Sequence, residues 1–205
     1  MPYRPTERTR ARLAAARERI VDAALAQLAE GGYASASVAS VARRAGVATG
    51  TVYRHFPSKA DLFAEVFRRA SQREVDVLRS MTDRDEPVGH RLAAWVEAFV
   101  RRALAEPVRA YALIAEPVDP AIEAERLTFR RAYADLFERA LHDGVHRGEL
   151  PPLDAQLTAA AIVGALAEAL VGPLERRQAG ADVLVAGLQT FVLRAVGIAH
   201  EHADA

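Results

Sequence analysis

A chain of 205 residues, 51% hydrophobic and 26% charged, is long enough to bury a core and has a globular composition. It has no cysteine, which excludes disulfides, thiolate metal ligands and a cysteine nucleophile. The net charge is zero, but residues 1–70 hold 12 Arg and Lys against 6 Asp and Glu, and residues 71–205 hold 15 against 21. This asymmetry favours an anionic partner at one end, with a solvated charged face as the alternative.

The first twelve residues contain two prolines and four arginines, and we predict that residues 1–12 form a flexible basic arm. The arm is expected to attract phosphates generally, and insertion into a minor groove is the alternative. No secretory signal is recognisable. The longest apolar run, from Leu157 to Pro173, is interrupted by Glu168 and is predicted to be a buried helix rather than a membrane span. We therefore expect a cytoplasmic protein with no membrane partner.

The first predicted helix covers residues 13–30, where apolar residues recur at helical spacing until Gly31 and Gly32 end it. Ser37 is a good N-cap for a second helix that ends at Gly46. Thr49 is predicted to cap a very short third helix, residues 50–55. Residues 37–55 are therefore predicted to form a helix, a tight turn and a short second helix.

A fourth helix is predicted to start after Ser58, with Asp61 as a partner in a capping box, and to continue toward Met81. Beyond a polar break, further helical segments are predicted near residues 88–105, 108–116, 120–147, 153–177 and 181–199. No segment alternates as a strand would. The fold is thus predicted to be all-α, with about nine helices.

The segment from Ser37 to Leu62 is the most informative part of the chain. Gly46 permits the positive φ of a sharp turn, and small residues such as Ala42 and Ala45 let the two helices approach closely. The short second helix leaves Thr49, Gly50, Thr51, Tyr53 and Arg54 on surfaces that packing does not need. Its N-terminus also offers backbone N–H groups to phosphates. The pattern is typical of a helix-turn-helix that enters the major groove.

Residues 13–70 resemble the DNA-binding domain of the TetR family of bacterial regulators. The resemblance is carried by Ile20-Val-Asp-Ala-Ala-Leu25, Gly31-Gly-Tyr33, Val41-Ala42, Ala45-Gly46-Val47 and the string Gly50-Thr-Val-Tyr-Arg-His-Phe-Pro-Ser-Lys-Ala-Asp-Leu62. It implies an N-terminal three-helix helix-turn-helix domain in residues 13–70. It further implies a helical C-terminal domain, residues 71–205, that binds a small effector and forms a homodimer.

The resemblance also implies roles at the DNA. Thr49, Gly50 and Thr51 would approach bases, Tyr53 and His55 would contact phosphates or base edges, and Lys59 would contact phosphate. Arg54 shares the same surface, Ser37 opens the supporting helix, and for His55 a capping or packing role is the alternative. Val38 and Ala39 are apolar where members often have threonine and a polar residue, which makes a contact from Ala39 doubtful.

The C-terminal domain has features that fit both implied roles. The last two long helices, about 153–177 and 181–199, carry broad apolar faces rich in small residues. We predict that they form the homodimer interface, with burial inside one chain as the alternative. The candidate effector-binding residues are Trp95, Phe99, Tyr111, Phe129, Arg130, Tyr133, Phe137 and Glu168, and His90, Arg109 and Glu116 are further polar candidates for orienting the ligand. An ion pair across the dimer is the alternative role for Glu168.

The predicted function is a ligand-responsive repressor that binds double-stranded operator DNA and needs no cofactor and no metal. His142 and His146 have the spacing of a metal pair, but they lie near a helix end and are expected to be surface residues. One rival is an enzyme in the C-terminal domain, yet no catalytic triad order, phosphate-binding loop or HExxH motif is present. The other rival is a DNA-binding or architectural protein without an effector, which predicts a solid core.

Overall fold

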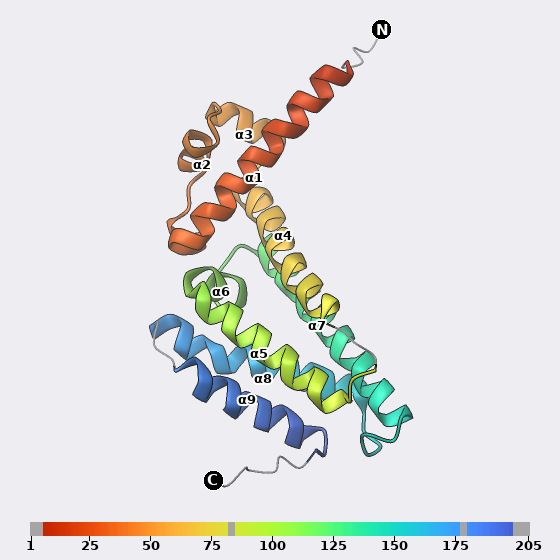
Figure 1. The fold of residues 1–205 in the computed structure, drawn as a ribbon. Coiled ribbons are helices and arrows are strands. Elements are labelled where there is room, and N and C mark those ends of the chain that lie inside the picture. Colours follow the sequence, from red (N-terminus) through yellow and green to blue (C-terminus); the bar gives the residue numbers. More distant parts are fainter. Residues whose placement is uncertain (1–5, 82–84, 177–179, 199–205) are drawn as a thin grey trace.

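The computed structural model describes residues 6–81, 85–176 and 180–198, which form nine α-helices and contain no strand. The helices are α1 Glu7–Ser35, α2 Val38–Ala45, α3 Thr49–His55, α4 Lys59–Ser80, α5 Val88–Ala105, α6 Pro107–Ile114, α7 Pro120–His146, α8 Ala155–Arg176 and α9 Ala181–Ala195. Figure 1 shows α1–α3 at one end, α5–α9 at the other and α4 running between them. The predicted all-α fold is confirmed.

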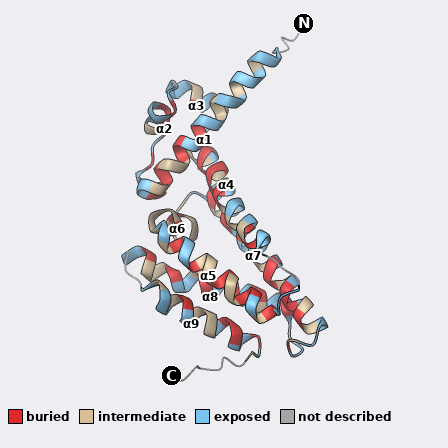
Figure 2. Ribbon diagram, in the orientation of Figure 1, coloured by how far each residue is buried: buried red, intermediate tan, exposed pale blue. Residues whose placement is uncertain are grey.

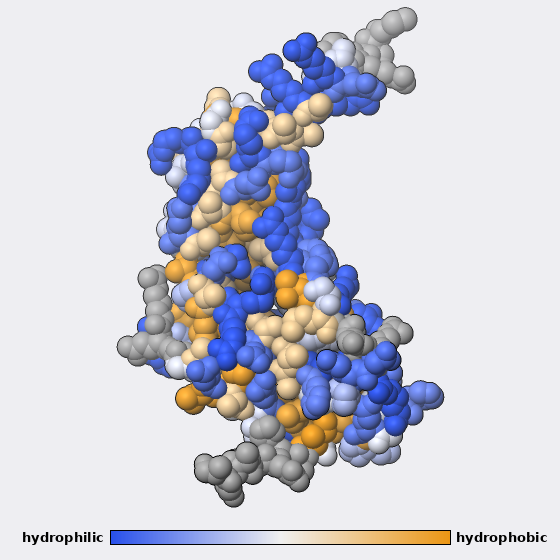
Figure 3. Space-filling view, viewed as in Figure 1, coloured by the Kyte–Doolittle hydropathy of each residue, from blue (hydrophilic) through white to orange (hydrophobic). Residues whose placement is uncertain are grey.

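The first helix begins at Glu7, so residues 7–12 are helical and that part of the predicted flexible arm is wrong. Thr6 caps the helix by accepting a hydrogen bond from the Thr9 amide, and Glu7 places a negative charge in the first turn. Alanine and arginine, both strong helix formers, then extend the helix away from the core. Its projecting end is covered by hydrophilic side chains in Figure 3. Residues 1–5 of the predicted arm lie outside the described residues.

The end of α1 is bent at Gly32, whose φ of 74° only glycine adopts without strain. Helical backbone resumes for Tyr33–Ser35, so the glycine pair interrupts the helix where the sequence predicted that it would stop. The bend leaves the Tyr33 and Ala34 amides without helical partners, and Glu116 accepts both. The break therefore sets a contact between α1 and the segment that follows α6.

The helix-turn-helix forms as predicted, with one difference at α3. Ser37 accepts a hydrogen bond from the Ser40 amide as the N-cap of α2, and Gly46 ends that helix at φ 66°. Ser58 caps α4 through the Asp61 amide. The predicted cap at Thr49 is wrong, because α3 begins one residue earlier and Ala48 occupies the cap position without a side-chain bond. Thr49 is instead the first helical residue.

Two hydrophobic cores hold the molecule together, and α4 contributes to both (Figure 2). The N-terminal core contains residues from α1–α4 and also Ala112 of α6 and Ile122 of α7, which are fully buried. The C-terminal core contains Val75 and Leu78 from the far end of α4. A single continuous helix therefore crosses the predicted domain boundary at residues 70 and 71 and is anchored on both sides.

The helix α8 is only partly covered within one chain. Among the described residues it is the one helix long and apolar enough to cross a membrane. Only 33% of its most apolar stretch is buried inside the chain. One face of α8 is thus buried in the core of the chain, as predicted, and the other face, assigned to the predicted dimer interface, is exposed. Leu157 is 67% exposed and Val183 on the neighbouring α9 is 78% exposed. An apolar face of this kind calls for a covering partner.

Candidate DNA-binding surface and effector pocket

The surface of α3 carries most of the predicted DNA-contacting side chains. Thr49, Gly50 and Arg54 are exposed, Tyr53 is 49% exposed, and Val52 is buried against the other helices of this domain. Thr51 and His55 are half-buried, and Ser37 is exposed at the start of α2. The structure thus brings the predicted residues of α3 onto one helix that protrudes from the domain beside α2 (Figure 1).

Gly50 occupies a position at which nothing in the chain requires a glycine. Its φ is not positive, and a Cβ added there would meet no atom within 4 Å. The missing side chain leaves room for close approach from outside, as a nucleic acid backbone would need. Arg54, beside it on the same helix, makes no hydrogen bond or ion pair with the described residues, so its charge is available.

The other cations near this surface differ in whether an acidic side chain of the chain already neutralises them. Arg44 makes a bidentate ion pair with Glu30, with N–O distances of 2.7 and 2.6 Å. The Lys59 ammonium donates to the Tyr33 carbonyl at 3.0 Å and lies 4.1 Å from the centre of the Tyr33 ring. Lys59 is half-buried and has no acidic partner among the described residues. Its contacts hold it at the junction of α1 and α4 with its charge uncompensated.

His55 closes α3 in an environment that disfavours its protonation. Burial lowers the pKa of the imidazole, and the nearby positive charges of Arg54 and Arg17 lower it further. Its Nε2 atom is buried and has no hydrogen-bond partner among the described residues. His55 is therefore held as a neutral side chain at the edge of the helix-turn-helix.

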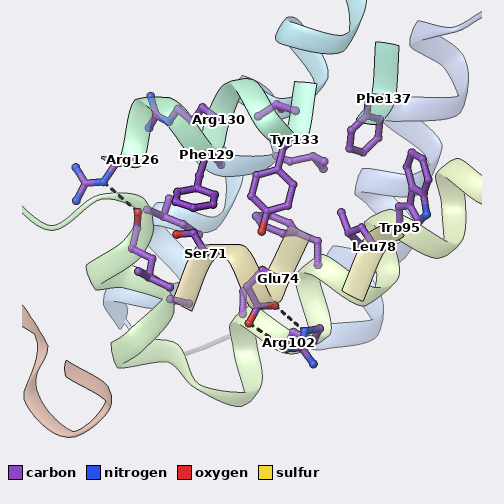
Figure 4. Close-up of a pocket in the computed structure, with 18 of the residues that line it drawn as sticks. Ser71, Glu74, Leu78, Trp95, Arg102, Arg126, Phe129, Arg130, Tyr133 and Phe137 are labelled. Atoms are coloured by element: carbon purple, nitrogen blue, oxygen red, sulfur yellow. Dashed lines mark hydrogen bonds and ion pairs between the residues drawn. The ribbon is translucent and has the colours of Figure 1, made fainter. Parts of the chain in front are cut away.

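A pocket with a cavity volume of about 100 Å³ lies in the C-terminal domain between α4, α5, α6, α7 and α8. Its walls are mostly apolar, with aromatic rings from α5 and α7. In Figure 4 Phe129 and Tyr133 of α7 face Ser71 and Glu74 of α4 across the pocket. The lining, aromatic and apolar with a few charged side chains, is that of a site for a small molecule.

Six of the eight predicted effector-binding residues line this pocket: Trp95, Phe99, Phe129, Arg130, Tyr133 and Phe137. Tyr111 does not line it and packs against the C-terminal core instead. Glu168 does not line it either, because it lies on the exposed side of α8 while Val163, Leu166 and Ala167 face inward. The interruption of an apolar run by Glu168 thus marks a surface face of the helix rather than the pocket.

Arg109 was a polar candidate from the sequence and lines the pocket, but sequence reasoning missed the contribution of α4 and also Arg102 and Arg126. Glu74 of α4 accepts two hydrogen bonds from Arg102 of α5, at 2.6 and 3.0 Å, and a longer one of 3.4 Å from Arg109 of α6. Burial raises the pKa of the Tyr133 phenol, and the Glu74 charge raises it further. The only signal in the sequence was the helical phase of Ser71, Glu74 and Leu78, which share one face of α4.

Arg126 connects the pocket wall to the end of α6. Its guanidinium donates to the carbonyls of Leu113 at 3.0 Å, Ala112 at 3.1 Å and Glu116 at 2.7 Å. Burial lowers the pKa of this guanidinium, although the group also pairs with Glu123. The carbonyls at a helix C-terminus lack helical partners, so one arginine satisfies several of them at once.

Glu116 joins this region to the DNA-binding end. Its buried carboxylate accepts hydrogen bonds from the Tyr33 and Ala34 amides at 2.7 and 2.9 Å. The Tyr33 hydroxyl donates to Asp119, and burial followed by this hydrogen bond raises the pKa of the phenol. The pocket residue Arg126 and the Lys59 junction are thus linked through Glu116 and Tyr33.

Comparison with known proteins agrees with this architecture. Residues 20–66 match the model for bacterial regulatory proteins of the tetR family, and residues 85–170 match that for a tetracycline repressor-like C-terminal domain. The HTH-type transcriptional repressor KstR of Mycolicibacterium smegmatis is 32% identical over 173 residues, which cover 82% of this chain and 80% of that protein. The chain belongs to the TetR family of DNA-binding transcriptional regulators.

Solved structures of the same fold include the fatty acid degradation regulator FadR of Bacillus halodurans, with a TM-score of 0.75 and 27% identity over 86% of this chain and 94% of that one. FadR of Bacillus subtilis in complex with stearoyl-CoA superposes with a TM-score of 0.74 at 22% identity, covering 89% and 99% of the two chains. The protein is a DNA-binding transcriptional repressor of this family.

Proposed function

We propose that this repressor binds a palindromic operator as a homodimer and is released when a small, mostly apolar effector enters the pocket. One observation carries the proposal: α4 forms a wall of the pocket through Ser71, Glu74 and Leu78, and its other end begins at Lys59 beside the helix-turn-helix. An effector that prefers a different position of α4 would therefore change the placement of the DNA-binding helices.

At the operator, Thr49, Gly50 and Thr51 would approach base edges, and Tyr53, Arg54 and His55 would contact phosphates or bases from the same helix. Lys59 and Ser37 would contact the phosphate backbone. The exposure of the α3 residues, the open space at Gly50 and the free charge of Arg54 support these roles. Cytoplasmic localisation follows from the proposed action on DNA.

The proposed dimer interface is a stripe on α8 and α9. Its α8 residues are Leu157, Ala161, Gly164 and Glu168, and its α9 residues are Val183, Gly187 and Phe191; all seven are exposed. Neither glycine would bring a Cβ within 4 Å of another atom of the chain, so both leave space for a partner helix. Two such pairs would form a four-helix interface. Glu168 lies in this stripe, where an ion pair across the dimer is its expected role.

The rival functions are less well supported. A DNA-binding protein without an effector predicts a solid C-terminal core, whereas this domain contains a pocket lined by aromatic rings. For an enzyme, the Ser71 hydroxyl in the pocket would need a base, yet Glu74 is hydrogen-bonded to Arg102 instead, and the relatives are transcriptional regulators. We therefore do not propose a catalytic activity.

The first experiment is selection of genomic DNA fragments by the purified protein, read by sequencing. A short palindrome bound by a dimer, with half-sites about 34 Å apart, is the expected result. Small apolar molecules would then be tested for release of that operator in a gel-shift titration. Enrichment of no sequence at any salt concentration, or an effector that binds tightly without changing operator affinity, would contradict the proposal.

A further inference from the structure

The pocket carries a marked excess of positive charge for a site with apolar walls. Arg102, Arg109, Arg126 and Arg130 line it, and Glu74 is the one carboxylate among its lining residues. Outside the lining, Glu106 pairs with Arg109 at 2.7 Å and Glu123 pairs with Arg126, so the positive charge that a ligand meets comes chiefly from Arg102 and Arg130. Arg130 is exposed and makes no hydrogen bond or ion pair with the described residues. An electropositive rim over an aromatic interior suits a molecule with an apolar body and an anionic head.

Glu74 already shows how such a head would bind. Its two oxygens accept from Nε and Nη2 of Arg102 at 2.6 and 3.0 Å, the paired geometry in which a guanidinium binds any carboxylate or phosphate. Arg109 adds a third donor at 3.4 Å. The two arginines come from α5 and α6, whereas Glu74 comes from α4. Arg109 has a closer partner in Glu106, at 2.7 Å, so the guanidinium that Glu74 chiefly occupies is that of Arg102.

The position of this ion pair allows exchange with an incoming anion. The Arg102 side chain is 41% exposed and that of Glu74 is 20% exposed, so the pair lies at the mouth of the pocket and not in its core. Replacement of one carboxylate by another preserves the charge of the site, and the released Glu74 regains water. The electrostatic cost of the exchange is therefore small.

We propose that the effector carries an anionic group that replaces Glu74 on Arg102 and Arg109 and thereby releases α4 from α5 and α6. The proposal rests on the effector function proposed above and specifies its ligand class and its trigger. The released element is the helix that begins at Lys59, so the exchange acts directly on the link to the DNA-binding surface. The effector's apolar body would fill the aromatic interior, where it contacts Phe129 and Tyr133 (Figure 4).

The binding test uses the single tryptophan of the chain, Trp95, which lines the pocket. Quenching of its fluorescence is titrated with dodecanoate, with dodecanoyl-CoA and with the neutral dodecanol. We expect either anion to bind about tenfold or more tightly than the alcohol, the difference of a charged hydrogen-bonded pair. The anion that binds more tightly distinguishes a carboxylate head from a nucleotide phosphate. Equal affinities for alcohol and anions would overturn the inference.

Two variants test the exchange itself. Arg102→Gln should remove the preference for the anions, and Glu74→Gln should increase their affinity while that of dodecanol stays unchanged. Without any ligand, Glu74→Gln should weaken operator binding about fivefold, because the ion pair that joins α4 to α5 and α6 is already lost. Asp76→Asn, an exposed carboxylate two residues along α4 that does not line the pocket, is the matched control. Thermal melting confirms that each variant is folded.

The outcomes separate this inference from the function on which it rests. If Glu74→Gln binds operator and anions as the wild type does, the exchange is wrong, although an effector pocket remains. If probes quench Trp95 but none releases operator from the wild type, the effector function itself is wrong, and the proposed trigger fails with it.

Discussion

The buried carboxylate of Glu116 offers the sharpest test of how the two ends of the molecule are joined. Glu116→Gln keeps the size of the side chain, but the amide retains one acceptor oxygen for two backbone donors. One of the Tyr33 and Ala34 amides, bound at 2.7 and 2.9 Å, would then face an NH₂ group. Loss of one charged hydrogen bond with a buried N–H left unpaired costs about 3 kcal/mol.

In a chain of this size that loss lowers the melting temperature by about 6–12 °C. Differential scanning calorimetry at neutral pH measures it directly. The matched control is Glu30→Gln, which breaks the exposed ion pair with Arg44 and should melt with the wild type. If Glu116→Gln also melts with the wild type, the carboxylate does not hold the end of α1, and the link from the pocket to Tyr33 fails.

Three further predictions concern the DNA-binding surface, the pH response and the dimer. Lys59→Ala should weaken binding to operator and random DNA alike and reduce the slope of log affinity against log salt by about one; a loss on operator alone would contradict the phosphate role. Because the folded protein lowers the pKa of His55, it binds fewer protons than the unfolded chain, so stability should fall as pH drops below about 6.5. His55→Gln should flatten that fall in urea titrations, and an unchanged profile would refute the effect. Gly187→Leu adds a Cβ that meets no atom of its own chain within 4 Å but lies on the proposed dimer stripe, so light scattering should detect monomers. An undiminished dimer would place the interface elsewhere.

The DNA-binding end could be predicted in detail because its signals are local. A cap at Ser37 or Ser58 and a turn at Gly46 depend on residues within one helical turn of each other, and all three form as expected. The two local errors both concern where a helix begins. α1 begins after Thr6, six residues before the predicted start, and α3 begins after Ala48 without a side-chain cap, because a capping residue favours a helix start but does not fix it.

The pocket was predictable only in its aromatic part. Large apolar side chains in the middle of the chain had to be buried somewhere, and most of them face the same cavity. Tyr111 and Glu168 were misplaced because the sequence shows that a helix has two faces without showing which neighbour each face meets. The exposed side of α8 is the same case: its apolar composition shows that it needs cover without showing what covers it, which we propose is a second copy of the chain.

By itself, the sequence determined the helices, their caps, the helix-turn-helix and the family, because these follow from periodicity and contacts between near neighbours. Only the tertiary structure decided that Glu74 meets Arg102 and Arg109. The same holds for Glu116, which accepts hydrogen bonds from the backbone amides of two residues that lie 83 and 82 positions earlier in the chain. Such pairs depend on how rigid helices cross in space. A small change in crossing angle alters which charged side chains meet, although the hydrophobic pattern stays the same.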